Sequence, residues 1–443
     1  MDQGVLIVPF GLVLAVLALF DSRIVLAIWS FTFLAMPTLR SKLGPVSVYW
    51  CDVAALLACF VCLRGAATVA SRSMTKWYIG LAVVHLIGVL TSLLRYQAIL
   101  EPGYEALRFG IAFLPLVLLP RIVDDDGAMD WFWHGVLASA LWMAAVALIQ
   151  YFWRDLALQF ETFLYGPRSV GSVNLAYRER AIMENTRLRV HGMYGASTCF
   201  AGAASMTGAL LMLRMSRIRA GLLTRLGVLG SAVAMLLTFS RHGLLAWGAL
   251  LIPPILRRPG RGAILPVILV GSVAVLGAGQ FWAERIGRGG VRDDENLSAR
   301  LVDRPLELLD RISDEPSILL TGVGLGTSHI VRPDADAPSR EGFVSNSFAL
   351  YLFYLGVWGL GVVVALLFTA LRVAWRLEGD VKGAALGGLT ATVVVIASDN
   401  YGFLHSSFPF MWAVLVALIH GYANLDEPLR EAEPRPEMAL HAP

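Results

Sequence analysis

Residues 344–369, VSNSFALYLFYLGVWGLGVVVALLFT, decide the fold class of this chain. The segment is apolar almost without interruption and contains no Asp, Glu, Lys or Arg. An apolar run of about 20 residues is long enough to cross a lipid bilayer as an α-helix. Because its hydrophobicity is continuous and does not alternate from residue to residue, a helix is favoured over a strand of a membrane barrel. We therefore expect a membrane-spanning helix here.

Similar apolar runs recur along nearly the whole chain. Its 443 residues are 57% hydrophobic and 16% charged, with a mean hydropathy of +0.65. This composition is too apolar and too weakly charged for a soluble fold. The sequence predicts an all-α, polytopic integral membrane protein of about 12–13 transmembrane helices. The expected spans are 4–20, 24–36, 47–63, 77–94, 105–120, 131–152, 191–213, 224–239, 242–256, 262–279, 344–369, 384–399 and 408–421.

One polar segment interrupts this pattern. Residues 280–343 form a connection far longer than the usual loop between two elements. The chain is therefore expected to consist of an N-terminal transmembrane bundle (1–279), a large extracytoplasmic loop (280–343) and C-terminal transmembrane helices (344–426). The segment 427–443, rich in Pro, Glu and Ala, is expected to be a disordered cytoplasmic tail.

The basic residues of the short loops predict the orientation in the membrane. Lys and Arg are enriched in cytoplasmic loops. On this basis the cytoplasmic groups are Arg214, Arg217, Arg219 and Arg225, then Arg257, Arg258 and Arg261, then Arg372, Arg376 and Lys382. The segments 153–190, 280–343 and 400–407 and the Ser240–Arg241 turn then face the opposite side. The parity of the first two spans stays open, and an N-terminus on the cytoplasmic side would make the total about twelve or fourteen spans.

Several classes of function are disfavoured. The net charge of +3 is spread over many short loops, which does not suit a nucleic-acid-binding surface. The four cysteines, Cys51, Cys59, Cys62 and Cys199, all fall in apolar segments, so neither a disulfide framework nor a zinc site is expected. The acidic run 293–295 is interpreted as a solvated stretch. We expect no metal and no cofactor.

Four arginines on the predicted extracytoplasmic side stand out. Arg189 precedes the span that opens at His191, Arg241 lies at a helix turn, and Arg300 and Arg304 lie in the long loop. A guanidinium group is always charged and binds phosphate oxygens in a bidentate manner. Such a set suits a pyrophosphate whose lipid tail stays in the bilayer. The alternative is that these arginines are solvated in long loops or extend to lipid headgroups.

Two further features invite a structural interpretation. The turn Gly322–Gly326 lacks the lysine and the strand-to-helix setting of a nucleotide-binding loop, so we expect a tight turn that docks the long loop on the membrane helices. Asp52, within the third span, is expected to be a buried carboxylate that pairs with another group or lines a cavity. The sequence does not identify its partner.

The order of several short motifs over residues 185–370 resembles the O-antigen ligase and O-antigen or exopolysaccharide polymerase superfamily of membrane glycosyltransferases. The matching residues are Arg189-x-x-Gly192, the Ser240-Arg241 turn followed by Gly243, Ser298-Ala-Arg300-Leu301 leading through Pro316 to Gly322–Gly326, Arg304-Pro-Leu-Glu-Leu308, and Asn346 ahead of Gly356-x-x-Gly359. The helix count elsewhere is compatible with this resemblance.

The resemblance implies a metal-independent enzyme of the bacterial inner membrane with its active site facing the periplasm. The expected donor is an undecaprenyl-pyrophosphate-linked glycan, the acceptor is a glycan or a lipid, and other polysaccharide assembly proteins are expected partners. Arg241 and Arg300 would be catalytic, whereas Arg189 and Arg304 would bind substrate. A polymerase is slightly favoured over a ligase. The rival class is a lipid-linked glycan flippase or transporter, which would place charged residues along a path across the bilayer.

The chain departs from the ligase pattern at one position. Ser345 stands where the ligases have the histidine that activates the acceptor hydroxyl, and a serine cannot act as a general base near neutral pH without a partner. His329 in the same loop is the first substitute, and His191, Asp399 and His405 are the others. Ser345 is retained as a substrate-binding candidate, and the neighbouring Asn346 would orient the acceptor or the loop.

Overall fold

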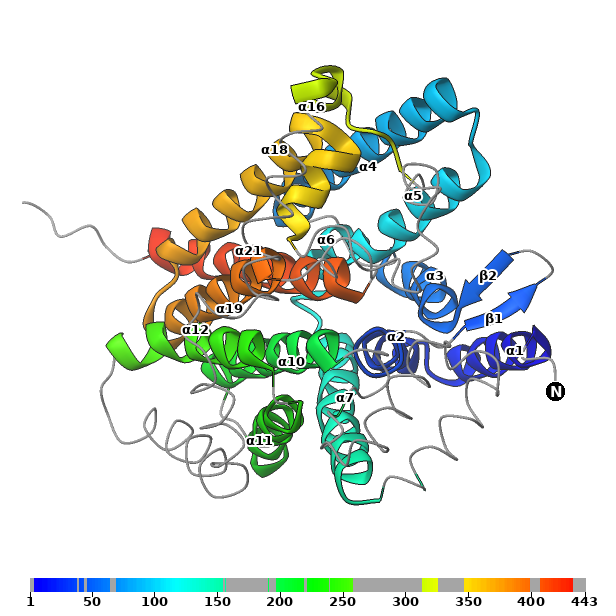
Figure 1. The fold of residues 1–443 in the computed structure, drawn as a ribbon. Helices are drawn as coiled ribbons and strands as arrows, with labels where there is room; N and C mark the ends of the chain where they lie inside the picture. The colour runs from blue at the N-terminus through cyan, green and yellow to red at the C-terminus, as the bar shows by residue number, and fades with distance from the viewer. Residues whose placement is uncertain are drawn as a thin grey trace, which may run out of the picture.

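The computed structural model describes residues 4–37, 40–43, 46–63, 69–153, 156, 190, 197–218, 221–238, 240–257, 313–325, 346–398 and 407–432. These residues form helices almost throughout, so the predicted all-α fold is confirmed (Figure 1). The helices are α1 (Gly4–Phe20), α2 (Ile24–Ala35), α3 (Trp50–Cys62), α4 (Val69–Tyr96), α5 (Leu100–Phe113), α6 (Pro115–Ile122), α7 (Asp126–Phe152), α10 (Ser197–Arg217), α11 (Leu222–Leu237), α12 (Arg241–Arg257), α16 (Ser317–Thr321), α18 (Ser347–Arg376), α19 (Gly379–Ser398) and α21 (Ser407–Ala432).

Length and composition mark the chain as a multi-pass membrane protein. Within the described residues, six helices are long and apolar enough to cross a bilayer: Ala70–Tyr96, Asp126–Phe152, Thr198–Arg217, Ser347–Arg376, Gly379–Ala397 and Phe408–Leu425. Four shorter apolar helices accompany them: Phe10–Phe20, Ile24–Ala35, Trp50–Cys62 and Leu222–Leu237. The span expected at 262–279 lies outside the described residues.

Three predicted boundaries need correction. The span expected at 105–120 is divided into α5 and α6, because Pro115 has no N–H to continue the hydrogen-bond ladder of α5. The span expected to begin at residue 47 begins at Trp50, since strand β2 (Val46–Tyr49) pairs with β1 (Arg40–Leu43) in an antiparallel hairpin. Helix α21 continues to Ala432, well past residue 421, where the last expected span ends, and residues 433–443 of the expected tail lie outside the described residues. Strong helix formers after Pro428 extend this helix.

Small residues allow the helices to pack closely. A β-carbon at Gly387 of α19 would collide with the carbonyl of Leu250 in α12, and one at Gly135 of α7 would collide with the carbonyl of Ala27 in α2. Helix α10 lies against α11, α12 and α19, and α4 lies against α18 (Figure 1). Close backbone approach of this kind is the usual basis of helix association in lipid.

Asp52 has a charged partner, as expected for a buried carboxylate. Its side chain, in α3, is almost completely buried, and its Oδ2 lies 3.7 Å from Nε of Arg108 in α5. The Arg108 guanidinium also lies 3.6 Å from the centroid of the Tyr49 ring, at the end of β2. The pair therefore joins α3 to α5 beside the hairpin. The sequence could not name Arg108, because the two residues are far apart in the chain.

The C-terminal end of α10 holds two of the arginines predicted to be cytoplasmic. Nη2 of Arg214 lies 3.3 Å from Oδ1 of Asp130 in the second turn of α7, and its guanidinium lies over the ring of Trp133. The guanidinium of Arg217 lies over the ring of Tyr422 in α21. These contacts place the end of α10 beside the start of α7 and the later part of α21.

Candidate functional site

Five of the predicted site residues fall outside the part of the chain that the structure describes. They are Arg189, Arg300, Arg304, His329 and Ser345. The structure describes Asn346 and the backbone of Arg241. These two residues, and the segments that flank the others, therefore define the candidate site.

Arg241 is the first residue of α12. Helix α11 ends at Leu237, and α12 begins at Arg241 after a short connection. This connection is stabilised locally, because the backbone N–H of Ser240 donates to Oγ1 of Thr238 and the N–H of Leu244 donates to the carbonyl of Ser240. The sequence-based prediction that Arg241 lies at a helix turn is confirmed.

His242 joins the start of α12 to the start of α10. Its Nε2 lies 2.8 Å from the carbonyl oxygen of Thr198, and its Nδ1 lies 2.8 Å from Oγ of Ser240. A carbonyl oxygen only accepts, so Nε2 carries a proton and donates it to Thr198. In the neutral ring Nδ1 then accepts a hydrogen bond from the Ser240 hydroxyl. One side chain thus ties the two helix ends together.

Gly243 also allows the first turns of α10 and α12 to lie close together. A β-carbon at this position would stand 2.8 Å from Cβ of Ala201 in α10, closer than two carbon atoms can pack. The glycine that contributes to the family resemblance therefore lies where the first turns of α10 and α12 meet. Arg189 lies outside the described residues, eight positions before Ser197, the first residue of α10.

His242 was not among the residues predicted from the sequence. The available signal was its position, directly after Ser240-Arg241 and before Gly243, in a chain with only 8 histidines. A polar ring at the start of an apolar helix needs hydrogen-bond partners. The partner Thr198 is remote in sequence and could not be identified without coordinates.

Replacing His242 with alanine should lower the free energy of unfolding by about 1–2 kcal/mol, because the carbonyl of Thr198 loses its donor. Ser240→Ala should lower the free energy of unfolding by less, since it removes only the hydrogen bond to Nδ1 of His242. Thermal unfolding of the detergent-purified protein measures both effects. His134→Ala is the matched control, because His134 is exposed on α7. Equal unfolding temperatures for His242→Ala and His134→Ala would contradict the bridging role.

Asn346 fixes the start of α18. Its Oδ1 accepts hydrogen bonds from the backbone N–H groups of Phe348 (2.9 Å) and Ala349 (3.3 Å), which is the geometry of a helix N-cap. The side-chain oxygen is therefore bonded to the helix itself. Asn346 was predicted to orient the acceptor or the loop, and this arrangement favours the loop, because the cap fixes the residue at which α18 begins.

Helix α18 is broken at Gly356. The φ of this residue is +67°, in the left-handed region that favours glycine, and helical geometry resumes after it. The break leaves carbonyl groups of the preceding turn without their normal partners within the helix. A β-carbon at Gly356 would collide with the carbonyl of Leu320, so another segment of the chain lies directly against the break.

That segment is the glycine-rich turn, of which the structure describes Gly322–Leu325. The N–H of Val323 donates to the carbonyl of Phe353 (2.8 Å), and the N–H of Gly324 donates to the carbonyl of Tyr354 (3.1 Å). Gly322 and Gly324 have φ values of +70° and +95°, which only glycine adopts readily. The turn therefore supplies the donors that the broken helix lacks.

The other side of the turn contacts α4. The N–H of Leu325 donates to the carbonyl of Gly88 (3.3 Å), and the hydroxyl of Ser92 donates to the carbonyl of Leu325 (2.6 Å). The predicted docking of the turn on the membrane helices is thereby confirmed for the described residues. Its two partners, the break at Gly356 and the α4 face formed by Gly88 and Ser92, were not predicted.

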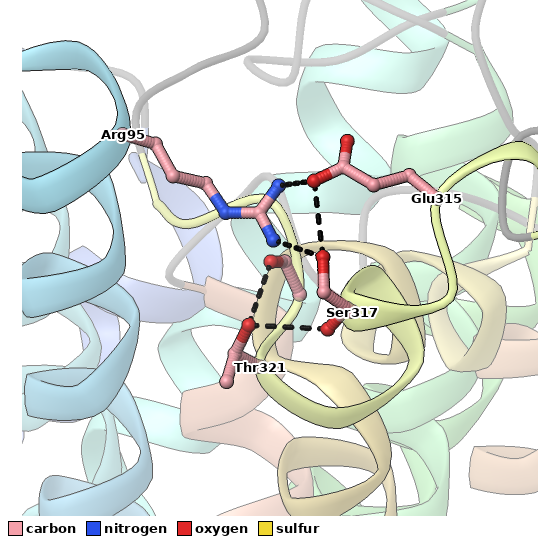
Figure 2. A network of polar contacts seen from close by, with 5 residues as sticks. Arg95, Glu315, Ser317 and Thr321 are labelled. Carbon is pink, nitrogen blue, oxygen red and sulfur yellow. Dashed lines mark hydrogen bonds and ion pairs between the residues drawn. The ribbon is translucent and has the colours of Figure 1, made fainter.

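A polar network holds α16, the short helix before this turn (Figure 2). Nη1 of Arg95, at the end of α4, lies 2.6 Å from Oε1 of Glu315, and Nη2 donates to Oγ of Ser317 (2.8 Å). The Ser317 hydroxyl in turn donates to the same Glu315 oxygen (3.0 Å). The hydroxyl of Thr321, the last residue of α16, donates a hydrogen bond to the carbonyl of Ser317.

The described parts of the candidate site thus form two constellations. One is the paired start of α10 and α12, and the other is the turn that docks between α4 and α18.

No protein-family model matches the sequence, and no curated protein matches it significantly.

Proposed function

We propose that the chain is a membrane glycosyltransferase. It transfers or polymerises an oligosaccharide carried on undecaprenyl pyrophosphate, at the periplasmic face of the bacterial inner membrane, in the synthesis of O-antigen or exopolysaccharide. The single observation that carries this proposal is the bridge from His242 to Ser240 and Thr198. It holds the first residue of α12, Arg241, near the start of α10, and Arg189 precedes that helix by eight residues in the sequence.

The chemistry follows from the charges. Outside the cytoplasm no nucleotide sugar is available, so the bond that breaks must itself supply the driving force, and the sugar–pyrophosphate bond does so. The acceptor hydroxyl oxygen attacks the anomeric carbon, the bond from that carbon to the pyrophosphate oxygen breaks, and the pyrophosphate leaves with the electron pair. Arg189, Arg241, Arg300 and Arg304 would stabilise the charge that develops on it.

The docked turn supports the same proposal. Hydrogen bonds to two helices attach the segment 322–325, which follows Arg300 and Arg304 in the sequence. A loop that is attached at a point along its length samples fewer positions than a free loop, which favours a repeatable placement of its arginines. Asn346, as the cap of α18, would fix the C-terminal end of the connection.

Reconstituted liposomes provide the experiment. Purified protein is given a labelled lipid-linked oligosaccharide and an acceptor, and the products are separated by size. The proposal predicts a new glycosidic bond and free undecaprenyl pyrophosphate. Labelled donor that crosses the bilayer without any new bond would instead favour the lipid-linked glycan flippase.

A deletion strain separates the two possible products. Single repeats attached to the acceptor would indicate that a polymerase has been lost, whereas long chains left on the carrier lipid would indicate that a ligase has been lost. We favour the polymerase, because Ser345 replaces the histidine of the ligases. Gel electrophoresis of the glycan distinguishes the two patterns.

His329 is the proposed general base, which takes the proton of the acceptor hydroxyl. His329→Ala should reduce the transfer rate about a hundredfold, since proton transfer by a positioned base contributes about 10²–10⁴ in rate. The rate is measured under saturating donor, with His134→Ala as the control. A loss of less than about threefold would remove His329 from this role and leave His191, Asp399 and His405 as the remaining candidates.

A further inference from the structure

Arg95 lies at the end of an apolar helix. It is the next-to-last residue of the segment Ala70–Tyr96, which is long enough to cross a bilayer, and a basic side chain at the end of such a segment can reach the lipid headgroups. Leu90 and Leu94, on the same helix, have exposed side chains. Leu319 and Leu320 of α16 are exposed as well. Exposed apolar side chains suited to contact with lipid tails are therefore present on both α4 and α16, the two helices that Arg95 joins.

The contacts of Arg95 form a site that can bind an anion. Its two terminal nitrogens reach Glu315 and Ser317, and Oε1 of Glu315 accepts from both the guanidinium and the Ser317 hydroxyl (Figure 2). A guanidinium and a hydroxyl that converge on one anionic oxygen would bind a phosphate oxygen equally well. The Glu315 carboxylate is the occupant that the chain itself supplies.

This occupant can be displaced. The side chain of Glu315 is 55% exposed, whereas that of Arg95 is 21% exposed. An ion pair with a solvated partner contributes little stability, so a phosphate can compete for the arginine. The turn after α16 does not depend on this pair, because Val323, Gly324 and Leu325 keep their own bonds to α18 and α4. Glu315 can leave without loss of the docked turn.

We propose that Arg95 and Ser317 bind the phosphate headgroup of a lipid whose tail lies along Leu90, Leu94 and α16, and that Glu315 blocks this site when the lipid is absent. The shared chemistry is a lipid-borne phosphate, which a bilayer phospholipid or a polyprenyl pyrophosphate can supply. Binding is expected whether or not the chain transfers sugars, so failure of the proposed function would leave this site intact.

The experiment compares variants that move binding in opposite directions. Full-length protein in a neutral detergent is titrated with phosphatidylglycerol, with undecaprenyl pyrophosphate and with phosphatidylcholine, and bound lipid is counted by native mass spectrometry. Arg95→Gln should weaken binding about tenfold or more, because it removes a charge-assisted hydrogen bond. Glu315→Gln should strengthen binding about twofold to fivefold, because the competing charge is removed.

Opposite changes in lipid affinity for Arg95→Gln and Glu315→Gln would exclude a role of this ion pair that is limited to holding α16 in place. Both substitutions break the same ion pair, so a role limited to holding α16 would change lipid binding in the same direction. Arg72→Gln, at the other end of α4, and Asp314→Asn, next to Glu315, are the matched controls and should bind as the unaltered protein does. Both control residues are exposed.

The lipids identify the source of the phosphate. Variant-sensitive binding of phosphatidylglycerol assigns the site to bilayer lipid, and sensitivity confined to undecaprenyl pyrophosphate assigns it to the carrier lipid. Phosphatidylcholine should bind more weakly, because its choline neutralises the phosphate. The proposal is overturned if Arg95→Gln binds all three lipids as the unaltered protein does, or if Glu315→Gln binds none of them more tightly.

Discussion

Arg241→Ala should reduce glycan transfer about a thousandfold, a loss of about 4 kcal/mol of transition-state stabilisation, while the protein remains in the membrane. In the proposed reaction, negative charge builds up on the departing pyrophosphate, and a guanidinium neutralises this charge better than water does. Because Arg241 is the first residue of α12, its backbone is held by the bonds of Ser240 and His242 and should not move on substitution. The measurement is the initial rate of product formation in reconstituted liposomes.

Two further variants sharpen this result. Arg241→Lys keeps the charge but loses the bidentate geometry, so an intermediate rate is expected. Arg225→Ala, at the opposite end of the neighbouring helix α11, removes an exposed arginine and should leave the rate unchanged. Arg300→Ala should resemble Arg241→Ala. Unchanged glycan yield and length for both Arg241→Ala and Arg300→Ala would contradict the proposed site.

Gly356→Ala should destabilise the protein by at least about 3 kcal/mol. The φ of +67° is unfavourable for alanine, and the new β-carbon would collide with the backbone of Leu320 and approach the N–H nitrogen of Gly322 to 2.9 Å. Backbone atoms cannot move aside as a flexible side chain can. The turn should therefore be expelled from the break in α18, with a lower unfolding temperature and faster proteolysis near residue 322.

Gly361→Ala on the same helix is the matched control. Nothing lies within 4 Å of a β-carbon at that position, and its backbone is helical. Alanine there should be neutral or slightly stabilising, since glycine is the weaker helix former. Equal unfolding temperatures for the two variants would show that the docked turn contributes no stability.

The sequence predicted the helices better than their contacts. Apolar runs at 131–152 and 344–369 are strong signals because membrane spans need about 20 apolar residues, and the structure has α7 and α18 there. The boundary errors have local causes, namely Pro115 between α5 and α6 and the hairpin before Trp50. Neither changes the apolar content enough to be visible as the end of a span.

The contacts within the candidate site were harder to predict, because they join segments that are remote in the sequence. The turn beginning at Gly322 was expected to dock on the membrane helices, but no pattern links it to Gly356 or to Ser92. Both Gly322 and Gly356 were noted as motif residues. Only the coordinates show that a β-carbon at Gly322 would collide with the backbone of Tyr354, and one at Gly356 with the backbone of Leu320. The same holds for His242 and Thr198, whose bond crosses between two helices.

Arg95 was not predicted as a binding residue for a different reason. At the end of an apolar span, an arginine is ordinarily explained by contact with headgroups, so the sequence gives no reason to select it. Its contacts with Glu315 and Ser317 become visible only when α16 is placed against α4.

The most direct measurement of the central claim is an electron cryomicroscopy structure with the lipid-linked donor bound. We expect the pyrophosphate to lie at the paired start of α10 and α12, with oxygens about 3 Å from guanidinium nitrogens of Arg241 and of at least one of Arg189 and Arg300. A donor bound elsewhere, or arginines on opposite sides of the bilayer, would contradict it.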